Sequence, residues 1–165
     1  MAVRAGGQGD VTKTHVVWRG SERSRIATPV YENGRLYWVN NHIANCIDAG
    51  TGKQVYQSPR LGDGTATAGP EPSKGPRPGG KSGRGGGGQE YSSPVMANGK
   101  IYWLARSGEA FVYAVGPEFK LFGQNSLASD GGDFSSTPAI SDGELFIRSS
   151  KYLYCVVEPI HGRVR

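Results

Sequence analysis

The stretch "IDAGTGKQVYQ" carries the residues of this chain most suggestive of phosphate chemistry, because a glycine pair flanks Thr51 and precedes Lys53. A phosphate-binding loop requires a glycine five residues before its Gly-Lys pair and Ser or Thr directly after it. Ile47 and Gln54 occupy those two places. The spacing therefore favours a tight turn, in which an Asp side chain bonds forward to backbone N–H groups and Gly52 adopts a positive φ.

Few other residues have types and spacings that indicate catalysis or metal binding. Asp130 and Asp133 in "SDGGDF" are the nearest approach to an acidic cluster, and a glycine-rich loop explains them better than Ca²⁺ spacing does. The three histidines, His15, His42 and His161, have no Ser, Cys or His partner at a sequence spacing typical of nucleophilic catalysis. We therefore predict no catalytic, cofactor-binding or metal-binding residue and no bound cofactor.

Composition favours one β-rich domain. The chain has 165 residues, with 26 glycines, 10 prolines and 16 aromatic residues, which is typical of strands and turns. The net charge of +5 is scattered, so we expect an ordinary basic surface rather than a nucleic-acid site. There is no apolar run long enough to span a membrane, and the first ten residues contain no signal-peptide core.

Three segments of the sequence repeat without gaps: "TPVYENGRLYWV" (28–39), "SPVMANGKIYWL" (93–104) and "TPAISDGELFIR" (137–148). Each begins with Ser or Thr and then Pro, which is tolerated near the start of a strand. Each continues with Asn-Gly or Asp-Gly, the strongest signal for a two-residue hairpin turn, followed by an aliphatic-aromatic return strand. Every repeat is therefore predicted to start with a β-hairpin.

The segment 62–90 interrupts the first repeat interval. Fifteen of its 29 residues are Gly or Pro and none is large and apolar. Without it the repeat period is about 40–44 residues, the size of a four-stranded propeller blade. We expect a disordered surface insertion. Its single Arg-Gly-Gly, without interleaved aromatic residues, argues against single-stranded nucleic acid as a ligand.

The two cysteines fall within the repeat pattern. Small-aliphatic pairs recur further along each unit, at Cys46-Ile47, Ala114-Val115 and Cys155-Val156, and Ala2-Val3 fits the same place in a preceding unit. Alanine alternates with cysteine there, so we predict a small buried position in each unit rather than a disulfide or metal pair.

The combination "TPV…NGRLYWV…CIDAGTGKQVY" resembles the repeat of pyrroloquinoline-quinone (PQQ)-like β-propellers. That motif has a small residue, an apolar residue, Asp, two variable residues and Thr-Gly-Lys, then Trp after two more. The matching residues are Cys46, Ile47, Asp48, Thr51, Gly52 and Lys53. Tyr56 stands where Trp is usual. The resemblance covers nearly all of the chain outside 62–90.

The resemblance implies an all-β fold, a partial β-propeller of three to four four-stranded antiparallel blades. Residues 1–165 form a single domain, with the end of a preceding blade at 1–19, blades at 27–60 and 91–124, and an incomplete last blade at 135–157. Relatives usually close rings of six to eight blades. We therefore expect the C-terminal part of a longer protein; the alternative is a homo-oligomer of half-rings.

The resemblance also implies a function. Some relatives are scaffold subunits of outer-membrane protein assembly and others are extracytoplasmic sensors. We predict a non-catalytic scaffold that binds a protein or ligand, in an exported, periplasmic bacterial protein, with the remaining blades supplied in cis. The alternative is a piece of a PQQ-dependent quinoprotein dehydrogenase whose catalytic residues lie upstream; this chain has no adjacent cysteines and no Ca²⁺-type acidic cluster.

Overall fold

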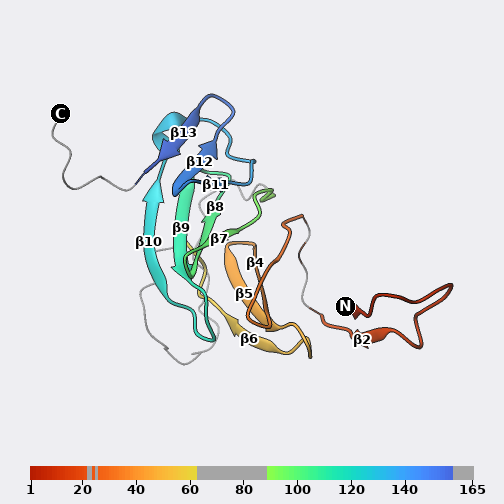
Figure 1. Cartoon of the computed structure of the whole chain (residues 1–165). Helices are drawn as coiled ribbons and strands as arrows, with labels where there is room; N and C mark the ends of the chain where they lie inside the picture. The colour runs from red at the N-terminus through yellow and green to blue at the C-terminus, as the bar shows by residue number, and fades with distance from the viewer. Residues whose placement is uncertain (22–23, 25, 63–88, 158–165) are drawn as a thin grey trace, which may run out of the picture.

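A computed structural model describes residues 1–21, 24, 26–62 and 89–157. The insertion predicted for 62–90 lies outside the described residues except for its ends at Gly62, Gln89 and Glu90. The fold is all-β, and the described part contains one short 3₁₀ helix, η1 (Ala128–Asp130). Figure 1 shows sheets stacked side by side, with a separate hairpin at the N-terminal end.

Two complete four-stranded antiparallel sheets form the centre of the molecule. Blade 1 consists of β3 (Val30–Glu32), β4 (Arg35–Asn40), β5 (Ile43–Asp48) and β6 (Gln54–Gln57). Blade 2 consists of β7 (Val95–Ala97), β8 (Lys100–Leu104), β9 (Glu109–Ala114) and β10 (Leu121–Ser126). The strands of each blade pair in chain order.

Incomplete sheets lie on either side of these two blades. Within the described residues, blade 3 has three strands, β11 (Ala139–Ser141), β12 (Glu144–Arg148) and β13 (Leu153–Val156). The N-terminal hairpin pairs β1 (Ala2–Val3) with β2 (Val16–Trp18). This hairpin lies within residues 1–19, for which we predicted the end of a preceding blade.

The first turn of every blade has the predicted hairpin geometry. Asn33 (φ 48°) and Gly34 (φ 77°) connect β3 to β4, and both have the positive φ that a type I′ turn requires. Asn98 and Asp142 occupy the same place in blades 2 and 3, with φ of 50° in each. Asn-Gly and Asp-Gly thus fix the register of the first two strands in all three blades.

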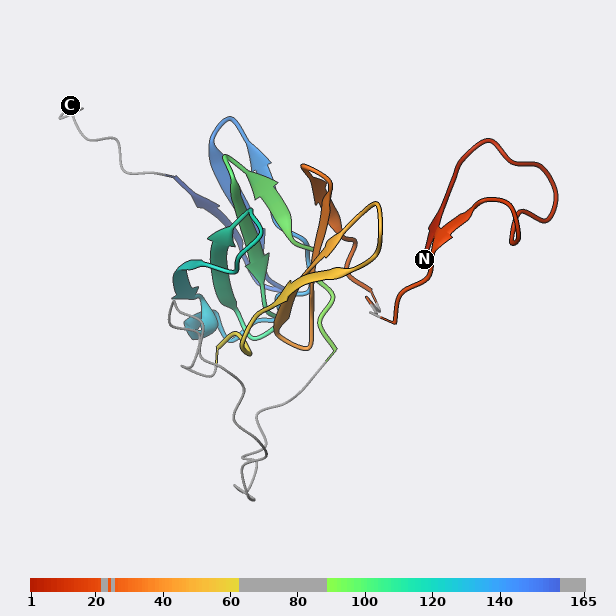
Figure 2. The same ribbon diagram turned by 90° about the horizontal axis from the view of Figure 1, so that it is seen from below.

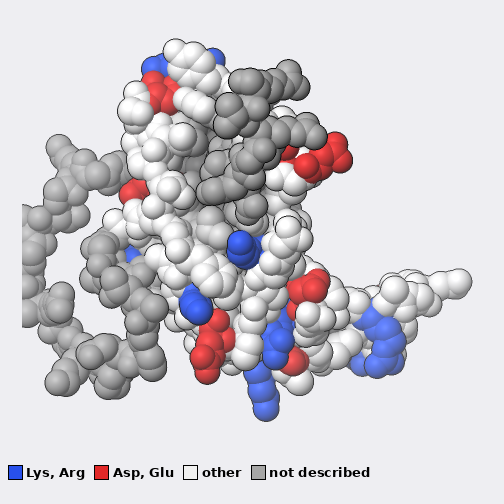
Figure 3. Space-filling model, turned by 60° about the vertical axis from the view of Figure 1, so that its left-hand side comes forward, with Lys and Arg blue, Asp and Glu red and all other residues white. Residues whose placement is uncertain are grey.

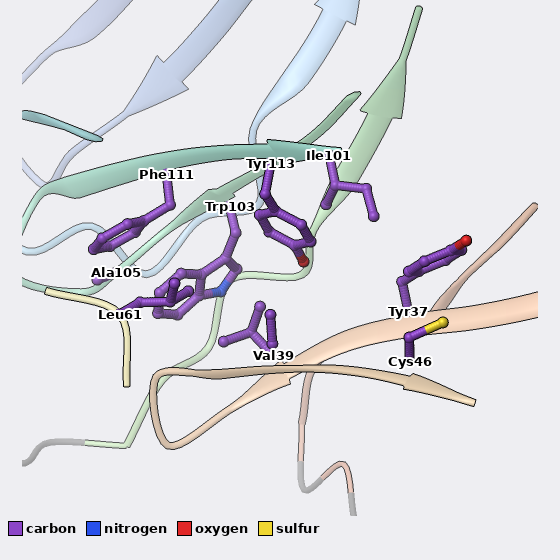
Figure 4. Close-up of a cluster of buried hydrophobic side chains, with 10 residues drawn as sticks. Tyr37, Val39, Cys46, Leu61, Ile101, Trp103, Ala105, Phe111 and Tyr113 are labelled. Carbon is purple, nitrogen blue, oxygen red and sulfur yellow. The ribbon is translucent and has the colours of Figure 1, made fainter. Parts of the chain in front are cut away.

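The blades pack face to face through apolar side chains. Between blades 1 and 2, Tyr37 and Cys46 meet Ile101, Trp103 and Tyr113, and all five are at most 1% exposed (Figure 4). Burial of side chains of this size stabilises a fold by about 1.5–3 kcal/mol each. A smaller cluster, Leu104, Phe134 and Ile147, joins blade 2 to blade 3.

A chain of hydrogen bonds connects the first residues of the three repeats. The N–H of Thr28 donates to Oγ of Ser93 (2.8 Å), and the N–H of Ser93 donates to Oγ1 of Thr137 (3.0 Å). These are the Ser and Thr residues that precede the repeated prolines. The repeated hydroxyl therefore has a physical role: it accepts the N–H of the preceding unit. We call this series the hydroxyl ladder.

One predicted equivalence between the repeats is wrong. Tyr37 pairs with Cys46, and Phe146 pairs with Cys155, so the two cysteines are equivalent. In blade 2 the same place belongs to Val112, because Lys100 pairs with Ala114 as Arg35 pairs with Asp48. Ala114 is therefore two residues away from the predicted position, because the sequence pattern of small and aliphatic residues did not count residues from the hairpin.

The predicted small buried position in each blade is also incorrect. Cys46 is buried under blade 2, whereas Cys155 is exposed. The reason is that the described residues contain no sheet over this face of blade 3. The two cysteines are free, and burial raises the pKa of the Cys46 thiol.

Candidate binding face at the loop end of the blades

The turns between second and third strands lie at one end of the blades, together with the connections from one blade to the next. In Figure 2 this end is the lower one, where η1 also lies, and the Asn-Gly and Asp-Gly hairpins lie at the opposite end. We call it the loop face. Side chains from all three blades form one polar network there.

His42 lies in the β4–β5 turn and holds both ends of the long connection between blades 1 and 2. Its Nε2 lies 2.9 Å from Oε1 of Glu90, and its Nδ1 lies 3.3 Å from the carbonyl oxygen of Leu61. The N–H of Leu61 in turn donates to the carbonyl oxygen of His42 (2.8 Å). The imidazole also packs edge-on against Trp103, with ring centroids 5.3 Å apart. We call this arrangement the His42 clamp.

Glu90 extends the network to blade 2 and onward to blade 3. Its Oε2 accepts the backbone N–H of Arg106 (2.7 Å). The Arg106 guanidinium pairs with the Asp133 carboxylate, which also accepts a hydrogen bond from the Ser135 hydroxyl. Hydrogen bonds from Ser135 and then from Arg106 hold the pKa of Asp133 below its ordinary value. The pairing also raises the pKa of Arg106.

Tyr91 is an exposed aromatic residue next to this network. The Arg106 guanidinium carbon lies 5.4 Å from the centroid of the Tyr91 ring, a cation–π arrangement. Tyr91 is 41% exposed and the Arg106 side chain 40% exposed. An exposed Tyr and Arg in contact, with the Arg also paired to the Asp133 carboxylate, have the composition of a protein-binding hot spot.

The remaining residues singled out in the sequence have structural partners. The Tyr154 hydroxyl donates to Oδ2 of Asp130 (2.8 Å), and Nζ of Lys151 donates to the Asp130 carbonyl oxygen (2.8 Å). His15 lies just before β2, where its Nδ1 is 2.7 Å from the Thr14 hydroxyl. His161 lies outside the described residues.

The Thr-Gly-Lys turn has the predicted geometry. Oδ1 of Asp48 accepts hydrogen bonds from the N–H and the hydroxyl of Thr51, both at 2.8 Å, which lowers the pKa of Asp48. Gly52 has a φ of 71°. Trp18 lies against this turn: its Nε1 donates to the Ala49 carbonyl oxygen (2.8 Å), and a Cβ on Gly52 would lie only 2.4 Å from the indole.

Tyr56, which stands where the PQQ-like repeat usually has Trp, faces the next blade. Its ring lies 5.9 Å from that of Phe119, centroid to centroid. Burial strongly raises the pKa of its hydroxyl.

Sequence reasoning missed the partnership of His42 with Glu90 and of Arg106 with Asp133. These pairs are 48 and 27 residues apart, and local spacing carries no signal for contacts made across blades. Within the ranges that the structure describes, no group of three or more His, Cys, Asp or Glu side chains is arranged to hold a metal ion. No helix in those ranges has the length and apolarity needed to cross a membrane.

Charges of both signs are interspersed on the face shown in Figure 3. This mixture of signs agrees with the scattered charge of the sequence.

No protein-family model and no curated protein sequence matches the chain. Among solved structures it is similar to BamB from Moraxella catarrhalis, with a TM-score of 0.52 and 12% identity over 79% of this chain and 32% of BamB. The computationally designed Ika8 protein aligns with a TM-score of 0.38 and 12% identity over 87% of this chain and 49% of Ika8.

The likeness to BamB, a β-propeller, shows the fold alone at this identity. The predicted fold class, a partial β-propeller of four-stranded antiparallel blades, is confirmed by this likeness and by the sheet topology. The chain spans about a third of the length of BamB.

Proposed function

We propose that this chain is a non-catalytic β-propeller scaffold that binds a protein partner through its loop face, outside the cytoplasm of a bacterium. The observation that carries the proposal is the exposed Tyr91–Arg106 pair, held by Glu90 and Asp133. Binding residues are commonly found on loops that a rigid scaffold positions. The blades provide that scaffold, and the resemblance to PQQ-like propellers supports the extracytoplasmic location.

Site-specific photocrosslinking in the native host tests the proposal. A photoreactive phenylalanine derivative is placed at Tyr91 and, in a matched control, at Phe122 on β10. Phe122 is likewise exposed (51%) and has a cation over its ring, with Nζ of Lys120 5.5 Å from the centroid. We expect an adduct with an extracytoplasmic protein from position 91 that is absent from position 122.

The substitution Arg106→Ala should reduce the adduct at position 91, because it removes the cation and releases the Asp133 carboxylate. Equal adducts from the two positions, or none from either, would contradict binding at the loop face. Turnover of alcohols or sugars by the purified chain with PQQ and Ca²⁺ would contradict the non-catalytic part and favour the dehydrogenase alternative.

A further inference from the structure

A row of polar side chains crosses blade 1 on the face that packs against blade 2. Tyr37 on β4 pairs with Cys46 on β5, and Cys46 pairs with Tyr56 on β6. Residues paired across neighbouring strands project to the same face of a sheet, where their side chains are in contact. The row therefore places two hydroxyls and a thiol within the apolar contact between two complete blades.

Tyr113 faces this row from blade 2, where it points from β9 toward blade 1 (Figure 4). Its ring and that of Tyr56 both pack against Phe119, with centroid distances of 5.6 and 5.9 Å. Burial, and then the proximity of Tyr56, Cys46 and Tyr37, raises the pKa of the Tyr113 hydroxyl well above its ordinary value. The polar groups of Tyr37, Cys46, Tyr56 and Tyr113 thus converge between the blades, and we call this cluster the tyrosine seam.

Two hydroxyls of the tyrosine seam are unsatisfied by protein groups. Those of Tyr56 and Tyr113 are buried, and neither has a hydrogen-bond partner among the residues that the structure describes. The Cys46 thiol is likewise free and completely buried. A buried hydroxyl without a partner costs free energy, and native proteins usually satisfy such groups with an ordered water when no protein group is within reach. A buried water typically makes about three hydrogen bonds of this kind.

The hydroxyls are not needed to form a blade. In blade 2 the equivalent row consists of Tyr102, Val112 and Gly123. In blade 3 the first two members are Phe146 and Cys155. Since Phe, Val and Gly have no polar side-chain group, the same strand pairing forms without a complete polar row. The buried hydroxyls of the tyrosine seam are therefore specific to the contact between blades 1 and 2.

We propose that the tyrosine seam binds one water molecule, which bridges the Tyr56 and Tyr113 hydroxyls. Each hydroxyl can donate one hydrogen bond and accept others, and a water molecule can complement both. The Cys46 thiol, a weak donor and acceptor, offers the third contact. The bound water joins blade 1 to blade 2 by hydrogen bonds inside an otherwise apolar contact.

Replacing each tyrosine by phenylalanine gives opposite results with and without the water. With the water bound, Tyr56→Phe and Tyr113→Phe each remove a satisfied hydroxyl and leave the other one orphaned. The equilibrium constant for folding, measured by urea denaturation, should therefore fall about 5-fold in each. The double variant has no orphaned hydroxyl, so its loss should be smaller than the product of the two single losses. Tyr31→Phe is the matched control, since Tyr31 is 63% exposed, and it should leave the constant unchanged.

A crystal structure at a resolution that shows ordered solvent identifies the bridging group. We expect one water within hydrogen-bonding distance of both hydroxyls in the wild-type chain, and none at that place in the double variant. Three results would each overturn the proposal: a Tyr56→Phe or Tyr113→Phe chain at least as stable as the wild type, fully multiplicative losses in the double variant, or two hydroxyls bonded directly to each other in the crystal.

Discussion

Replacing Gly52 by alanine tests how the Thr-Gly-Lys turn is used. At this position two costs combine. An alanine with the φ of 71° found here costs about 1–2 kcal/mol in backbone energy. Its Cβ would also lie 2.4 Å from the Trp18 indole, so the indole must move away. Displacing Trp18 breaks its 2.8 Å hydrogen bond to the Ala49 carbonyl, which contributes about 0.5–1.5 kcal/mol, and loses buried area as well.

Gly34→Ala isolates the first of these costs. Gly34 has a similar φ of 77°, and a Cβ there would have nothing within 4 Å. We therefore expect Gly34→Ala to lower the free energy of unfolding by about 1–2 kcal/mol and Gly52→Ala by about 2–4 kcal/mol. Urea denaturation followed by circular dichroism, at one fixed protein concentration, measures both.

The same Gly52→Ala substitution in a Trp18→Ala chain provides the control. In a Trp18→Ala chain the indole is gone, so Gly52→Ala should cost no more than Gly34→Ala does. If Gly52→Ala and Gly34→Ala destabilise the wild-type chain equally, the indole does not rest on this turn. The reasoning that ties the N-terminal hairpin to blade 1 would then be refuted.

Three further predictions concern the ladder, the network and the core. Ser93→Ala should lower the free energy of unfolding by about 1 kcal/mol, because the Thr28 N–H loses its acceptor, and Ser93→Thr should not; urea denaturation measures both. Because the pKa of Asp133 is lowered in the fold, its ionised carboxylate stabilises the protein above the ordinary Asp pKa of about 3.9, and this stabilisation is lost as the pH falls through the folded-state pKa. Thermal melts at a series of pH values should therefore show that the melting temperature of Asp133→Asn falls less steeply in acid than that of the wild-type chain. An equal fall in the two proteins would contradict the pairing. Leu61→Ala should lower the free energy of unfolding, measured by urea denaturation, by about 2–5 kcal/mol, because Leu61 is 1% exposed in the main core. A loss below about 1 kcal/mol would show that the neighbouring side chains close around the gap.

The repeat made the blades predictable from sequence because its signals are local. Asn33-Gly34 and its two counterparts specify a turn by backbone sterics alone, so strand order and the first-turn register follow from a few residues. The Asp48 turn is predictable for the same reason, since its hydrogen bonds span three residues.

Contacts between blades were not predictable in this way. The His42–Glu90 pair connects residues on either side of a long insertion, and no local sequence feature of either residue predicts the contact. The alignment of Ala114 with Cys46 failed because a small-aliphatic pair also occurs two residues further along β9, and only the pairing with the second strand shows which residue is equivalent. The repeated Ser or Thr before proline was visible in the sequence, but its acceptor role appears only when neighbouring blades are in contact.

The His42 clamp makes the connection between blades 1 and 2 insensitive to its own length. Leu61 and Glu90 are held within reach of one imidazole ring, so the chain between them starts and finishes at adjacent points of a rigid surface. Doubling the length of a flexible loop between such fixed points costs only about 0.6 kcal/mol in closure entropy. The connection between Leu61 and Glu90 is therefore suited to insertions. An epitope, a reporter or an entire domain with neighbouring termini can be inserted there without disturbing the strand registers of blades 1 and 2.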